Sequence, residues 1–90
     1  MKINHNIVLE LEKKCKCPIL EMFWTEDDNR WYVCFQEDIV IDGVDQIVHL
    51  DEVMSEVKKY DNIEWFTNEV YIDDDNHDTW FEQVTFQWEE

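Results

Sequence analysis

The run Asp73-Asp74-Asp75-Asn76-His77-Asp78 places several oxygen-bearing side chains close together, which is the chemistry that binds calcium. An EF-hand loop needs ligands at alternate positions, glycine at the sixth and glutamate at the twelfth. Counting from Asp73, those two positions hold Asp78 and Val84, so the run is not an EF-hand. We interpret it as a solvated loop, with a loose, weak cation site in a metal-dependent regulator as an alternative.

Cysteine and histidine provide the other metal-binding side chains. A zinc site would combine Cys15, Cys17 and Cys34 with His5 or His49. The Cys-x-Cys spacing is shorter than the usual zinc spacing, and two helical residues so spaced point in nearly opposite directions. An odd number of cysteines also fits reduced thiols better than a disulfide framework. We therefore expect neither a metal nor another cofactor.

Catalytic patterns are missing from the sequence. It contains no glycine-rich phosphate loop, no nucleophile elbow and no His-Glu-x-x-His. His5, His49 and His77 are scattered along the chain. Acidic residues are so abundant that a pair of carboxylates indicates nothing about catalysis. The sequence therefore predicts a protein that is not an enzyme.

The net charge is the most informative property of the sequence. The 90 residues include 23 Asp and Glu against seven Lys and Arg, which gives a formal net charge of −16. Solubility of a small domain requires a net charge of only about 2–8 in magnitude. A basic partner or halophilic adaptation would explain the excess. The sign of the charge disfavours direct binding to DNA, RNA or an anionic membrane.

The charge is also unevenly distributed, because no Lys or Arg follows Lys59. The C-terminal part therefore carries acids alone and should form an uninterrupted negative field. These acids are Asp61, Glu64, Glu69, Asp73, Asp74, Asp75, Asp78, Glu82, Glu89 and Glu90.

Carboxylates on strands and loops can imitate the phosphates of a nucleic acid, since same-face residues on a strand repeat at about 6.6 Å. In size and charge the chain resembles the small acidic inhibitors of phages and mobile elements, including anti-restriction and anti-CRISPR proteins. This resemblance includes no sequence motif. It implies a basic nucleic-acid-binding partner, of the nuclease or CRISPR/restriction effector type, whose surface the protein would block.

The residues predicted to contact the partner share the C-terminal part of the chain. They are Glu64, Glu69, Asp73, Asp74, Asp75, Asp78, Glu82, Glu89 and Glu90 as fixed charges, with Trp80 and Phe81 as apolar contacts. Five Trp are more than so small a core can enclose, so one or two should be partly exposed. The alternative is an acidic interaction or assembly module without mimicry, homodimeric through residues 79–88.

Two helices are predicted. An apolar stripe that includes Val8, Leu11 and Cys15 predicts a helix over residues 6–16, with Asn6 as its N-cap and Pro18 beyond its end. A second stripe predicts a helix over residues 50–60, and an alternative starts that helix at Asp45.

Strands are predicted from alternating or short apolar runs, and Asp42-Gly43 indicates a tight hairpin. The predicted strands are residues 19–24, 30–36, 38–41, 44–48, 63–66, 70–72 and 79–88. In the last of them Glu82 falls on the apolar face and Phe81 on the polar face. The order α-β-β-β-β-α-β-β-β predicts one α+β domain, residues 1–90, with a mostly antiparallel sheet and both helices on one face.

The location of the protein is predicted from what the sequence lacks. Its first residues contain no signal-peptide apolar run, and no apolar stretch approaches the roughly 20 residues of a membrane span. The expected location is therefore cytoplasmic.

Self-repulsion among the acids should make stability depend on salt. We expect the free energy of unfolding, measured by urea denaturation, to rise with sodium chloride, because screening relieves the repulsion. Mild acidification should raise it too, before internal ion pairs are broken. A free energy that stays constant from low to moderate salt would show that the charges are already compensated.

Overall fold

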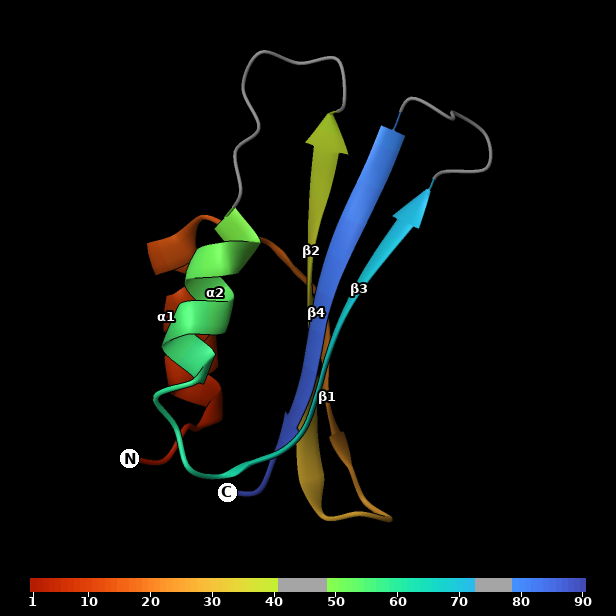
Figure 1. Cartoon of the computed structure of the whole chain (residues 1–90). Helices are drawn as coiled ribbons and strands as arrows, with labels where there is room; N and C mark the ends of the chain where they lie inside the picture. Colours follow the sequence, from red (N-terminus) through yellow and green to blue (C-terminus); the bar gives the residue numbers. More distant parts are fainter. Residues whose placement is uncertain (41–48, 73–78) are drawn as a thin grey trace.

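The computed structural model describes residues 1–40, 49–72 and 79–90. Two helices lie on one face of a four-stranded antiparallel sheet whose strand order is β1-β2-β4-β3 (Figure 1). The elements are α1 (His5–Cys15), β1 (Ile19–Thr25), β2 (Arg30–Val40), α2 (His49–Val57), β3 (Ile63–Ile72) and β4 (Thr79–Trp88). The α+β class and the packing of both helices on one face are confirmed.

Two strands are longer than predicted. β3 is one continuous strand where residues 63–66 and 70–72 were expected to be separate. β2, from Arg30 to Val40, likewise joins the strands predicted over residues 30–36 and 38–41, and residue 41 lies outside the described residues. β3 lies at the edge of the sheet, where the polar side chains of Asn68 and Glu69 stay exposed without cost. The predicted Asp42-Gly43 hairpin, the strand 44–48, the helix start at Asp45 and the 73–78 loop lie outside the described residues.

The predicted N-cap of the first helix is wrong by two residues. Asn4, not Asn6, caps α1, since its side-chain oxygen accepts a hydrogen bond from the Ile7 amide at 3.0 Å. At the other end Lys16 adopts a left-handed conformation with φ of 54°, which closes the helix before Pro18.

The core lies between the helices and the two central strands, β2 and β4. Phe35 of β2 and Phe86 of β4 stack with their centroids 6.1 Å apart. The fully buried side chains also include Ile3, Val8, Cys15, Cys17, Val33, Leu50, Val53, Val84 and Trp88. Burial of this apolar surface is the main stabilising contribution. In the described part of the chain, neither helix has the length and apolar character needed to cross a membrane.

The short helix α2 depends on a carboxylate from β2. The two side-chain oxygens of Glu37 accept hydrogen bonds from the His49 and Leu50 amides, at 2.9 and 3.0 Å. These amides have no partner within a helix, and a negative charge suits the positive N-terminal end. A nine-residue helix is marginal by itself, so this contact fixes where α2 begins. It ends at Val57, earlier than the predicted residue 60.

Buried Asn62 joins the two ends of the described chain. Its side-chain oxygen accepts from the Ile3 amide at 2.7 Å, and its amide group donates to the carbonyls of Ile3 and Glu89 at 3.0 and 2.6 Å. Figure 1 shows the N and C termini at the same end of the molecule.

We predict opposite effects for two glutamates that face each other across β2 and β4, Glu37 and Glu82. Glu37→Ala should lower the free energy of unfolding by about 1–3 kcal/mol, because two helix amides lose their acceptor. Glu82→Ala removes a like charge directly opposite and should leave stability unchanged or raise it by up to about 1 kcal/mol. Urea denaturation measures both, and equal losses would contradict the role of Glu37.

Candidate functional site

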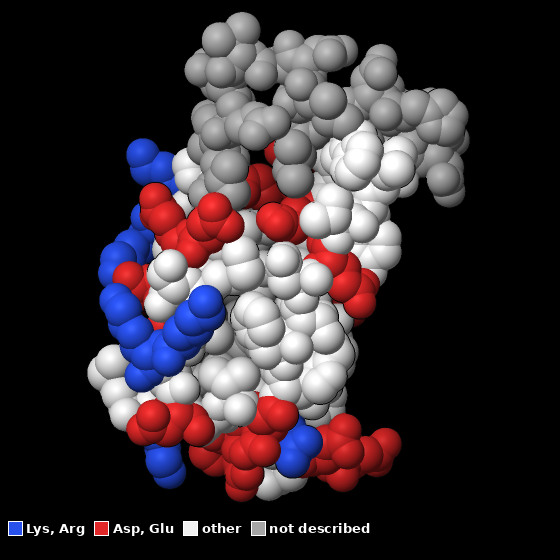
Figure 2. Space-filling view, in the orientation of Figure 1, with Lys and Arg blue, Asp and Glu red and all other residues white. Residues whose placement is uncertain are grey.

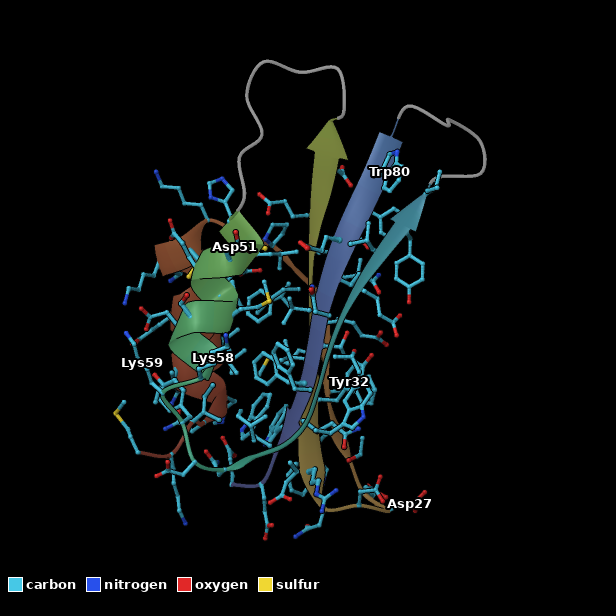
Figure 3. The ribbon with its side chains drawn as sticks, viewed as in Figure 1. Asp27, Tyr32, Asp51, Lys58, Lys59 and Trp80 are labelled. Carbon is cyan, nitrogen blue, oxygen red and sulfur yellow. The ribbon has the colours of Figure 1, made fainter. Side chains whose placement is uncertain are left out.

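The face of the sheet opposite the helices carries two aromatic rows. In the first row Phe23, Tyr32, Gln87 and Trp65 lie side by side across β1, β2, β4 and β3. Phe23 and Tyr32 stack with centroids 4.6 Å apart, and Phe23 and Trp65 are 40% and 44% exposed. Figure 3 shows Tyr32 on the side of the sheet away from the helices. We call this surface the open face.

The second aromatic row of the open face lies toward the other end of the strands. Here Asp38, Phe81 and Tyr71 are neighbours across β2, β4 and β3. Tyr71 and Phe81 stack at 5.3 Å, and Tyr71 is 39% exposed. Exposed aromatic side chains next to acids are typical of the anchors in protein interfaces.

Small and polar side chains separate the two aromatic rows. Cys34 and Thr85 are buried at the centre of the open face, outside the main core. Beside them Gln83 donates a hydrogen bond to Gln36 at 2.9 Å. Burial raises the pKa of the adjacent Tyr32 hydroxyl. The open face is therefore a packed, ordered surface.

The charges divide between the two layers of the molecule. The lysines lie in the N-terminal segment, in α1 and in the residues that follow each helix, and Figure 2 shows most of the basic side chains on the helix side of the molecule. Two of them, Lys14 and Lys59, contact Glu56 at 3.0 and 3.1 Å, and the hydrogen bond with Glu56 raises the pKa of Lys14.

The strands contain one basic residue, Arg30, which lies 3.8 Å from Glu64. By strand alternation, the carboxylates of the open face are those of Glu21, Asp38 and Glu69, on three different strands. All three residues are exposed. The charge asymmetry along the sequence thus becomes an asymmetry between the helix layer and the sheet layer.

The structure brings some of the predicted contact residues together and separates others. Glu69 and Phe81 lie on the open face, whereas Trp80 and Glu82 have the alternation of the helix-covered face. Glu64 lies at the bulge near the start of β3. The predicted aspartates Asp73, Asp74, Asp75 and Asp78 lie outside the described residues.

Four aromatic residues of the open face, Phe23, Tyr32, Trp65 and Tyr71, were not predicted as contacts. The alternation along β3 places Trp65 and Tyr71 on one face, but it appears only when residues 63–72 are treated as a single strand. The polar centre of that segment concealed the pattern.

Glu89 and Glu90 are both exposed, but the Glu90 carboxylate is hydrogen-bonded to residues of the fold. The carboxylate of Glu90 accepts from the His5 amide at 2.6 Å and from Trp31 Nε1 at 2.9 Å, and the His5 ring Nδ1 lies 3.1 Å away. Burial raises the pKa of Glu90, but these bonds outweigh it and hold the pKa below its usual value. Glu90 therefore stabilises the start of α1.

The described residues contain little that suits a cofactor. No three His, Cys, Asp or Glu side chains among them are placed to hold a metal ion. The three cysteines are free and buried, and burial raises the pKa of Cys17 to about 12. A depression of about 240 Å³ lies between Pro18 and His49, but the Glu37 carboxylate that lines it is already bonded to α2.

Comparison with known proteins adds no family to this description. No protein-family model, curated protein or solved structure matches the chain. The function is therefore inferred from the chemistry of the surface.

A pH-dependent contribution to stability is predicted for Glu90. Glu90→Ala should lower the free energy of unfolding by about 1 kcal/mol near neutral pH, because two hydrogen bonds are lost. The folded-state pKa is depressed, so the contribution is present above the ordinary glutamate pKa and disappears as the pH falls through the folded value.

The matched control is Glu89→Ala, which changes an exposed side chain and should have little effect. Urea denaturation of both variants across the acidic range measures the difference. A deficit in the Glu90 variant that persists at the lowest pH would contradict the assignment.

Proposed function

We propose that this protein acts without catalysis, by using its sheet layer to bind the positively charged surface of a partner protein. The observation that carries the proposal is the segregation of charge. The lysines belong to the helix layer and the N-terminal segment, while the strands contain only Arg30, close to Glu64. A basic surface approaching the sheet would meet exposed carboxylates with little competing positive charge.

The aromatic rows distinguish this surface from one that binds nucleic acid itself. Open sheets with exposed aromatics can stack on bases, but such proteins also need cations to neutralise phosphates. The open face has three carboxylates and, by the same alternation, one cation, Arg30, which lies close to Glu64. Its aromatic side chains are therefore better suited to apolar contacts with a protein, while the acids supply the charge.

The more specific form of the proposal is nucleic-acid mimicry. Neighbouring strands lie about 4.8 Å apart, so Glu21, Asp38 and Glu69 form a sparse two-dimensional array of negative charge. A groove lined with Lys and Arg that normally holds phosphates would accept such an array. The partner class is then a nuclease or a CRISPR or restriction effector, and binding would block its nucleic acid.

A homodimeric assembly module is the competing function. It was predicted to form through residues 79–88, but β4 is paired on both sides, by β2 and β3, so a second copy would have to use the exposed aromatic rows. Each copy also brings a net charge of −16 to the contact. Repulsion of that size favours a basic partner at physiological ionic strength.

The test compares two double charge reversals of equal total charge. Glu21→Lys with Glu69→Lys changes the open face, whereas Glu10→Lys with Glu52→Lys changes exposed positions of the helices. For a partner recovered by affinity capture, the first pair should weaken binding by about tenfold or more and the second should have little effect. Thermal melting of each variant checks the fold.

Mimicry has its own readout in the same system. Binding should weaken steeply with salt, and DNA or RNA that the partner normally holds should compete with the protein. A partner that holds nucleic acid and this protein at the same time would contradict mimicry. Equal losses from both double reversals would contradict the use of the open face.

A further inference from the structure

The outer edge of β3 offers unpaired backbone groups. β3 is the last strand in the order β1-β2-β4-β3, and it pairs on one side with β4. Within the described residues its other side has no backbone hydrogen-bond partner. An edge of this kind can accept one more strand.

β3 has few of the features that usually protect an edge strand, and its one bulge is confined to the start of the strand, between Ile63 and Trp65. Its ten residues contain no Lys, Pro or Gly, and from Trp65 to Ile72 its register with β4 is regular. The opposite edge, β1, is only seven residues long and is bulged between Ile19 and Glu21. Short length, bulges, Pro and Lys are the common protections against strand addition, so β3 is the more receptive edge.

The side chains of β3 present a different chemistry on each side. On the helix side Phe66, Val70 and Ile72 are exposed to 39%, 52% and 50%, and the polar, exposed Asn68 lies between Phe66 and Val70. Next to Phe66 a shallow depression of about 190 Å³ is lined by residues that include Val57 and Tyr60. An added strand would extend this apolar side and remove it from water.

On the open-face side β3 presents Trp65, Thr67, Glu69 and Tyr71. A Lys or Arg in an added strand would lie close to the Glu69 carboxylate and to two exposed aromatic rings, which attract cations. The two sides together therefore match a strand that alternates basic and apolar residues. A second copy of β3 would bring glutamates in place of cations, together with a further charge of −16.

We propose that β3 binds an extended segment of the partner, with alternating basic and apolar residues, as a fifth strand of the sheet. This inference rests on the proposed function, because it names how the basic partner docks. Main-chain hydrogen bonds would supply affinity, and the alternating side chains would supply specificity.

The probe is a synthetic peptide of about ten residues that alternates lysine and valine, a length that matches one strand. The control peptide has the same side chains and charge but is N-methylated at consecutive central residues, which blocks hydrogen bonding along both of its edges. The unmodified peptide should bind at least about tenfold more tightly, measured by tryptophan fluorescence. Hydrogen exchange should show new protection of β3 amides.

Variants of the protein provide a second test. Val70→Lys places a protective charge on the exposed edge and should abolish the preference for the unmodified peptide. Leu9→Lys, at a position of α1 that is 45% exposed, is the matched control and should retain it. Circular dichroism checks folding. If the Val70 variant does not fold, the comparison of the two peptides on the unchanged protein tests the inference.

Three results would overturn the inference, and each has a different meaning. Equal binding of both peptides without β3 protection leaves basic binding in place and refutes strand addition. If neither peptide binds, the proposed function fails as well. If sedimentation shows a dimer of the protein alone whose β3 amides are already protected, the edge is occupied by a second copy.

Discussion

The packing of both helices on the same face of the sheet determines which surfaces face solvent. The central strands β2 and β4 place Val33, Phe35, Val84 and Phe86 on that face, and the apolar sides of α1 and α2 cover them. Burial of these side chains drives the packing. As a consequence the opposite face and the β3 edge remain uncovered by the described residues, and the lysines stay with the helix layer. The proposed binding surface thus follows from where the core forms.

Two groups of acids in this chain have different roles. Glu37 and Glu90 accept hydrogen bonds from backbone amides at the starts of α2 and α1. Glu12 accepts a hydrogen bond from the Ile19 amide at 2.6 Å. Hydrogen bonds from backbone amides stabilise a carboxylate without a cation, which suits a chain with so few Lys and Arg residues. Among the described residues, the exposed open-face acids Glu21 and Glu69 accept no hydrogen bond from a backbone amide. They increase self-repulsion, and a binding function would explain why the sequence carries them.

The sequence predicted the class of the fold and most element positions, because the core stripes of the helices and of residues 79–88 are strongly periodic. β3 was divided in two, since an edge strand exposes polar residues on both sides and its alternation is weak. Asn6 was predicted as the N-cap because it directly precedes the apolar stripe, whereas the observed cap, Asn4, lies two residues earlier. The Glu90 carboxylate helps to decide between them from the far end of the chain, where local sequence gives no indication.

The candidate site was predicted less completely than the fold. Net charge and its uneven distribution predicted an acidic surface in the C-terminal part, and Glu69 and Phe81 of that part lie on the open face. Its other two carboxylates, Glu21 and Asp38, come from β1 and β2 and were not predicted. Which acids form hydrogen bonds within the fold, as Glu90 does, depends on contacts between distant segments and cannot be predicted from composition. The aromatic rows also depend on register, since Phe23 meets Tyr32 only after β1 and β2 pair.

The most direct measurement of the central claim is a chemical-shift map of the isotope-labelled protein in complex with its captured partner. Binding through the sheet layer predicts that the large shifts fall on β1, β3 and the open-face residues of β2 and β4. The amides of α1 and α2 should stay near their free positions. Large shifts confined to α1, α2 and the lysine-bearing residues after them, with the strands unchanged, would contradict the account.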